Sequence, residues 1–227
     1  MTLNDQQKAS RRGFLGSMVT GAAAMGMAAM AAPMKAAAET GFSFSGSEGV
    51  EDWFLKIKGK HKIVFDAPEF NEGMPLAFPR VFQITNNSSG VANGELGIVI
   101  VLRHNALPLA LQSNLWSKYN LGELFKINDP ATNAPAKRNF FWEPKEGELE
   151  LPGMSIRDLK NTGVLFCVCE MAIFHYSMLA AKKAGLDHEI VRKEWTAAII
   201  PNIQPVPSGV FAVNRAQEQG CTYCFAG

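Results

Sequence analysis

The sequence predicts an α/β domain, a three-layer sandwich in which helices cover both faces of a mostly parallel sheet of about five strands. Apolar, β-branched runs alternate along the chain with segments of helical periodicity. One of these runs, 96–102, is apolar throughout, as expected for a strand that is buried on both faces. The chain has 227 residues, of which 47% are hydrophobic, so it can bury one sizeable core. Its 22 basic and 21 acidic residues nearly balance, which argues against a disordered or nucleic-acid-binding protein.

The amino-terminal segment has the pattern of an export signal. Arg11 and Arg12 precede a weakly apolar run at 16–32 and a small-residue site that ends at Ala38. This pattern resembles a twin-arginine signal, which implies cleavage near Ala38 and export of the folded chain to the periplasm. The run is too short and too weakly hydrophobic for a stable membrane span. Cleavage would remove four of the 22 basic and one of the 21 acidic residues, which leaves 18 and 20.

A flexible lead-in rich in Ser and Gly is expected at 39–52, before a single domain at 53–227. A β-branched and aromatic run predicts the first strand at 62–66. Helical spacing follows at 76–85, and the apolar run described above predicts the next strand. Pro108 is expected to open a helix, because proline suits the first helical position.

A long excursion interrupts this alternation at 126–154. It contains four prolines and the aromatic residues Phe140, Phe141 and Trp142, and it has no regular period. The aromatic residues favour an ordered segment over a disordered one. We expect these three aromatic residues to form a contact between subunits.

Strands and helices alternate again after the excursion. Ser155 and Asp158 have capping-box spacing and predict a short helix. Gly185 stops one later helix, and Asp187 caps the next. The other expected elements are a strand at 163–169, helices at 170–184 and 187–199, a strand at 203–206, a helix capped by Ser208 and an edge strand at 221–225.

The four cysteines occur as two pairs, Cys167-x-Cys169 and Cys221-x-x-Cys224. Residues two apart in a strand point to the same side, so Cys167 and Cys169 are expected to face together. Cys169 ends a buried strand, and Glu170 begins the next helix. The positive end of a helix favours a thiolate, so Cys169 is the first candidate for a reactive thiol.

Three interpretations of the cysteines stay open. The first is a structural disulfide in a non-catalytic subunit, because exported proteins meet an oxidising compartment. The second is thiol or sulfur chemistry, in which Cys221 and Cys224 form a dithiol that opens and closes. The third is a zinc or iron–sulfur site that uses Cys167, Cys169, Cys221 and Cys224, although a C-x-C pair on a buried strand is poorly suited to wrap one ion.

Polar residues follow the strand at 96–102 and extend the candidate site. The carboxyl ends of parallel strands meet at one edge of a sheet, so these residues are expected near Cys169. His104 is the candidate catalytic partner of Cys169. The candidate ligand-binding residues are Arg103, Asn105 and Glu170.

Other polar residues are expected to be structural. Asp66 and Glu69 lie near the end of the first strand, where polar residues gather because chains turn there. His175 falls inside an apolar helix and is expected in the core or at a subunit contact. The sequence contains no glycine-rich nucleotide loop, serine-hydrolase elbow or zinc-protease motif.

The carboxyl-terminal part of the chain resembles the DsrE/DsrF-like proteins of the YchN-like fold. The resemblance is best over 160–224 and weaker over 60–125. The residues that carry it are 168–170, 206–210, 216–220 and 222–223.

This resemblance implies a flavodoxin-like sandwich and homo-oligomers such as trimers or hexamers. In sulfur-relay members it also implies a cysteine that carries persulfide sulfur, here Cys169, and a sulfur-donor or redox partner protein. The export signal, the excursion and the terminal C-x-x-C depart from the family pattern. We therefore expect an exported DsrE-like protein that handles sulfur or thiols through Cys169.

Overall fold

The structure is a computed structural model that describes residues 49–227. The predicted export signal at 1–38 and most of the predicted lead-in lie outside the described residues. The domain begins earlier than expected, with helix α3 (Val50–Phe54), because Val50 is already buried in the core. Among the described residues, no helix is both long and apolar enough to span a bilayer.

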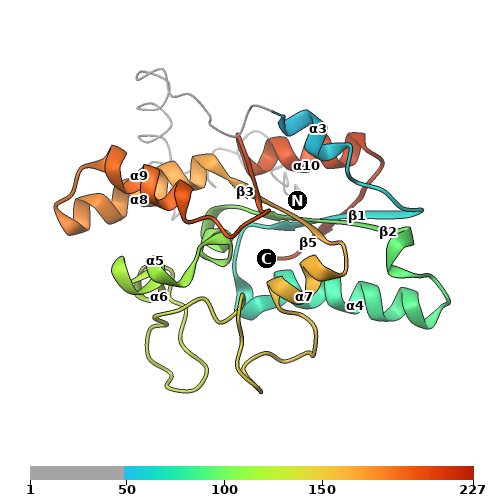
Figure 1. Cartoon of the computed structure of the whole chain (residues 1–227), viewed down its shortest axis with the longest axis horizontal. Helices are drawn as coiled ribbons and strands as arrows, with labels where there is room; N and C mark the ends of the chain where they lie inside the picture. Colours follow the sequence, from blue (N-terminus) through green and yellow to red (C-terminus); the bar gives the residue numbers. More distant parts are fainter. Residues whose placement is uncertain (1–48) are drawn as a thin grey trace, which may run out of the picture. The chain divides into compact units, whose positions relative to one another are not determined.

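Five parallel strands form one sheet in the order β4-β3-β2-β1-β5 (Figure 1). The predicted α/β fold class is confirmed, with an all-parallel sheet and helices on both of its faces. Strand β2 is buried along its whole length, as its apolar sequence predicts. The strands are β1 (His61–Ala67), β2 (Leu96–Leu102), β3 (Leu165–Cys169), β4 (Gln204–Val206) and β5 (Thr222–Phe225).

Helices pack on both faces of the sheet (Figure 1). Helix α4 (Met74–Ser88) and helix α7 (Ile156–Asn161) lie on one face, and α3 and α10 (Gly209–Glu218) lie on the other. Helices α8 (Glu170–Ala184) and α9 (His188–Ala197) pack against each other. The short elements are α5 (Ser113–Lys118), α6 (Leu121–Leu124) and the 3₁₀ helices η3 (Asn71–Gly73), η4 (Asn93–Glu95) and η5 (His104–Ala110).

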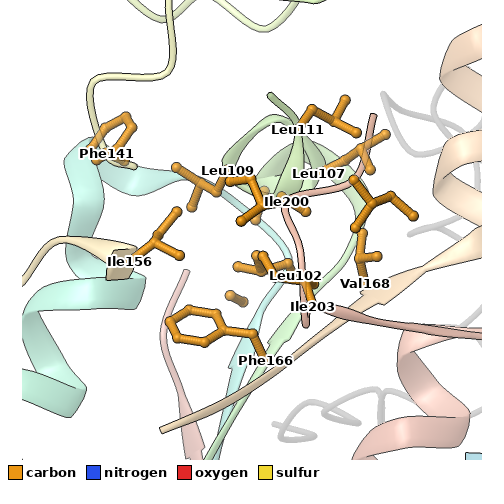
Figure 2. Close-up of a cluster of buried hydrophobic side chains, with 14 of the residues drawn as sticks. Leu102, Leu107, Leu109, Leu111, Phe141, Ile156, Phe166, Val168, Ile200 and Ile203 are labelled. Atoms are coloured by element: carbon orange, nitrogen blue, oxygen red, sulfur yellow. The ribbon is translucent and has the colours of Figure 1, made fainter. Parts of the chain in front are cut away.

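Two apolar clusters hold the layers together. The first cluster lies on the α4 side, where Leu102, Phe166 and Val168 of the sheet pack with Phe141 and Ile156 (Figure 2). The second cluster lies on the α10 side and is smaller. It contains Val64, Val99, Val101, Cys167, Ala212 and Ala216. Alternate residues of β2 serve opposite faces, as the pleat requires. At the end of β3 the alternation stops, because Cys169 belongs to the first cluster together with Val168, while Cys167 belongs to the second. The expectation that Cys167 and Cys169 face together is therefore wrong.

The predicted helix caps are confirmed. The Ser155 hydroxyl accepts a hydrogen bond from the backbone N–H of Asp158 at 3.0 Å and caps α7. Asp187 caps α9 in the same way, and Ser208 caps α10. Gly185 ends α8 in the left-handed conformation with φ 66°.

The prediction for Pro108 is wrong. Pro108 lies inside the 3₁₀ helix η5 rather than at the start of an α-helix. The backbone of Leu111 is extended and forms an antiparallel bridge with Ile199. The next α-helix therefore begins at Ser113.

The excursion at 126–154 is ordered without containing a helix or strand. Its buried Asn139 side chain donates hydrogen bonds to the backbone carbonyls of Leu109 and Leu111. Phe140 and Phe141 are 5% and 2% exposed and belong to the first cluster, so the expected subunit contact is wrong for these two residues. Cores and subunit interfaces are both rich in aromatic residues. The sequence pattern alone therefore could not distinguish a core position from a subunit contact for Phe140 and Phe141.

Candidate functional site

The register of the sheet brings Arg103 and Cys169 to the same level. Leu102, the last residue of β2, pairs with Val168 of β3. Arg103 directly follows β2, and Cys169 is the next and last residue of β3. Asp66 lies on the neighbouring β1, where it pairs with Val101. These side chains share the carboxyl edge of the sheet, where open α/β sheets bind ligands.

The sulfur of Cys169 lies at the start of two helices. Cys169 is the N-cap of α8, and its Sγ accepts a hydrogen bond from the backbone N–H of Ala172 at 3.3 Å. The backbone N–H groups of Met171 and Gly209 also bond to this sulfur, and Gly209 is the first residue of α10. Both helices thus direct their positive ends toward one thiol.

The Cys169 thiol is nevertheless buried, with 6% of the residue exposed. Burial raises its pKa, while the three N–H groups and Arg103 act to lower it. The pKa is raised on balance. The helix N-terminus therefore acts in the predicted direction, but desolvation outweighs it and keeps the thiol protonated at neutral pH.

Arg103 is held beside this thiol by Asp66. Its Nε donates to Asp66 Oδ1 at 2.6 Å, and its Nη2 donates to Asp66 Oδ2 at 2.9 Å. This bidentate pair raises the pKa of Arg103, and it fixes the plane of the guanidinium. The hydroxyl of Tyr223 donates a third hydrogen bond to Asp66 Oδ2 at 3.0 Å.

Gly209 packs against both Arg103 and Cys169. A Cβ atom at this position would lie 2.5 Å from Arg103 Cδ and 2.6 Å from Arg103 Cβ. A larger residue would therefore displace the Arg103 stem. The absence of a side chain lets the arginine and the helix N-terminus approach the same sulfur.

His104 and Asn105 belong to a separate polar group, which we call the Tyr176 cluster. His104 Nδ1 lies 3.5 Å from Glu69 Oε1, and the His104 ring meets the Tyr176 ring edge-on. Asn105 donates to Glu69 and accepts from the Tyr176 hydroxyl. Burial, and then Glu69, raise the pKa of Tyr176 to about 12. Among the described residues, the hydrogen bonds and electrostatic partners of the Cys169 sulfur do not include His104, although Cys169 and Tyr176 belong to the same apolar cluster. The expected pairing of His104 with Cys169 is therefore not made.

The remaining candidate residues lie around these two groups. Glu170 is buried at the first position of α8, where its charge suits the positive helix end. His175, on the same helix, stacks edge-on against Tyr176. Burial, and then His104, lower the pKa of His175.

The four cysteines do not come together. Cys167 is fully buried in the second cluster, and burial raises its pKa. Cys221 also belongs to the second cluster, whereas Cys224 packs against the first. Residues three apart on an extended chain point to opposite sides, so the expected dithiol or disulfide between Cys221 and Cys224 is not formed.

The same separation rules out the expected four-sulfur site in this arrangement of the chain. In residues 49–227, no group of three or more His, Cys, Asp or Glu side chains is placed to hold a metal ion. The residues present therefore do not fit a zinc ion or an iron–sulfur cluster held by four cysteines.

A separate cavity of about 180 Å³ is lined by residues of α5, α6 and α8, away from Cys169. Its lysines are already paired, since Lys118 bonds to Glu194 at 2.7 Å and Lys183 bonds to Glu123 at 2.9 Å. This cavity therefore offers no free cation for an anionic ligand.

Sequence reasoning missed three members of the thiol site. The sequence predicts a structural role for Asp66, and it marks Tyr223 only as one of the residues that carry the family resemblance. Gly209 followed the cap Ser208 and gave no sign that it approaches Arg103. The position of Asp66 at the end of a strand is the one sequence signal that could have placed it near Cys169. The positions of Tyr223 and Gly209 depend on how the strands pair, and the register of a sheet cannot be read from the sequence of one strand.

No family model and no curated protein matches the chain. Among solved structures, the chain is similar to MTH1491, a protein of unknown function from Methanobacterium thermoautotrophicum. The two share 15% identity with a TM-score of 0.38, over 73% of this chain and 98% of that chain. A likeness of this size carries no argument about function.

Proposed function

We propose that this protein handles sulfur, and that Cys169 accepts a sulfur atom from a donor persulfide and holds it as a cysteine persulfide. The observation that carries the proposal is the environment of the Cys169 sulfur. Three backbone N–H groups from two helices and one arginine surround it. Such donors stabilise an anionic sulfur, the reactive form of a thiol and of a persulfide.

The transfer balances without an external oxidant. The Cys169 sulfur, as thiolate, attacks the outer sulfur of a donor R–S–SH, and a new S–S bond forms as the donor S–S bond breaks. The leaving R–S⁻ takes up the proton that Cys169 gave up. Cys169–SH and R–S–SH thus give Cys169–S–SH and R–SH.

The guanidinium of Arg103 has a defined task in this step. It keeps its positive charge at any working pH, so it stabilises negative charge and does not act as the base. Because Asp66 holds it in a bidentate pair, the charge stays beside the sulfur during transfer. The proposal also includes export to the periplasm and a homo-oligomer, which rest on the signal-like sequence and on the family resemblance.

Mass spectrometry of the intact protein tests the proposal. After incubation with a low-molecular-weight persulfide and removal of the donor, the native protein should gain about 32 Da, one sulfur atom, and lose it on reduction. The Cys169→Ser variant should gain nothing. The matched control is Cys224→Ser, which removes a more exposed thiol and should load like the native protein. Equal loading of Cys169→Ser and the native protein would refute a role for Cys169.

A second candidate function is a non-catalytic subunit. One observation favours it, since burial raises the pKa of all four thiols and leaves them protonated at neutral pH. A protein that gains no sulfur under any of these conditions would fit this second candidate.

A further inference from the structure

The last strand of the chain, β5, contacts the group of residues around the Cys169 thiol through the side chain of Tyr223. Tyr223 lies on β5, an edge strand that pairs only with β1 among the described strands. The Tyr223 residue is 48% exposed, yet its hydroxyl bonds to the carboxylate of Asp66, which is 5% exposed. The end of β5 is fixed nearby, because the backbone N–H of Ala226 donates to the Asp66 carbonyl at 2.8 Å.

This contact completes a chain of interactions that ends at Cys169. Asp66 Oδ2 accepts from both Tyr223 and Arg103, while Asp66 Oδ1 accepts from Arg103 alone. Two donors on one carboxylate oxygen fix the rotation of the carboxylate. A bidentate pair needs that fixed plane, because both of its N–H groups must align with both oxygens.

We infer that Tyr223 is a positioning residue for Cys169: its hydroxyl holds the Asp66 carboxylate in the orientation that keeps the Arg103 guanidinium beside the sulfur. The inference deepens the proposed function and rests on it for its biological meaning. The Arg103 side chain is 27% exposed, so water offers its guanidinium an alternative partner. Loss of the tyrosine hydroxyl therefore lets the pair loosen and moves positive charge away from the thiol.

The test compares two variants on the same strand. Tyr223→Phe removes only the hydroxyl that bonds Asp66. Thr222→Val is the matched control, since it removes the hydrogen bond from the Thr222 hydroxyl to the Lys62 carbonyl, at 3.1 Å, without touching Asp66. Urea unfolding of both variants checks that each stays folded and that their losses of stability are comparable.

The readout is the rate of alkylation of Cys169 as a function of pH, followed at the level of the peptide. Tyr223→Phe should slow alkylation about threefold at a fixed pH near neutrality. It should also move the midpoint of the pH dependence of the alkylation rate upward by about half a pH unit. The charged and titratable groups around the sulfur are Arg103, Asp66, Glu170, Cys167 and Tyr223.

Two outcomes decide the inference. If Tyr223→Phe and Thr222→Val have the same midpoint as the native protein, Tyr223 is not a positioning residue, even where sulfur loading of Cys169 succeeds. If only Tyr223→Phe moves the midpoint, the inference holds. Failure of sulfur loading in the native protein would then reject the proposed function and leave the positioning role intact.

Discussion

At the residue scale, two opposed effects act on Cys169. Burial disfavours the thiolate, and the three N–H groups with Arg103 favour it. The raised pKa means that the folded state prefers the neutral thiol. The contribution of the neutral Cys169 thiol to the free energy of unfolding is fully present below the pKa that this thiol has in the unfolded chain. It is lost as the pH rises through the pKa of the thiol in the folded protein.

The charge of Arg103 makes a testable contribution to this balance. Arg103→Gln should raise the pKa of Cys169 further, because it removes the cation that favours the thiolate. Alkylation of Cys169 should then be about tenfold slower at neutral pH, with its midpoint moved to more alkaline pH. The rate is measured across the pH range on the peptide that contains Cys169.

Arg157→Gln is the matched control for this variant. It makes the same change of charge at an exposed arginine that pairs with Glu143 on the excursion. Its pH profile should equal that of the native protein. Equal shifts in the two variants would mean that net charge, and not the place of Arg103, sets the reactivity.

At the scale of elements, most of the fold could be predicted from the sequence. The apolar run of β2 and the caps Ser155, Asp187 and Ser208 each depend on neighbouring residues, so local patterns were sufficient. The segment around Pro108 was not predictable in this way. Its conformation depends on the bridge between Leu111 and Ile199, which lie far apart in the chain.

The cap of α10 is an element whose function can be separated from its contribution to stability. Ser208→Ala removes the cap and loosens the turn that directs the Gly209 N–H at Cys169. We expect a loss of about 1 kcal/mol in the free energy of unfolding, with an upward shift in the midpoint of Cys169 alkylation. Urea unfolding and the pH profile of alkylation measure the two effects.

Asp187→Ala provides the comparison, because Asp187 caps α9 by the same kind of hydrogen bond. It should cost a similar free energy of unfolding and leave the Cys169 profile unchanged. If both variants shift the pH profile of Cys169 alkylation equally, general loosening of the fold explains the shift. The orientation of the α10 N-terminus toward Cys169 would then not be its cause.

At the scale of the whole domain, the parallel sheet gathers the site from distant parts of the chain. Tyr223 and Asp66 are 157 residues apart in sequence and meet because β5 pairs with β1. The sequence predicted that Arg103 and Cys169 would meet at the carboxyl edge of the sheet, since parallel strands end together. It could not predict that Asp66 and Tyr223 would join them, because strand order and register decide which side chains share a level. For the same reason His104 lies against Tyr176 and is not paired with Cys169.

If the proposed sulfur transfer occurs, the surroundings of a sulfur, and not its exposure, should decide which thiol accepts the sulfur atom. The most direct test treats the native protein with a limiting amount of persulfide donor and locates the added sulfur by peptide mass spectrometry. We expect most of the added sulfur on Cys169, although Cys169 is 6% exposed and Cys224 is the less buried thiol. Sulfur found mainly on Cys224, with Cys169 unmodified, would refute the proposed role of Cys169.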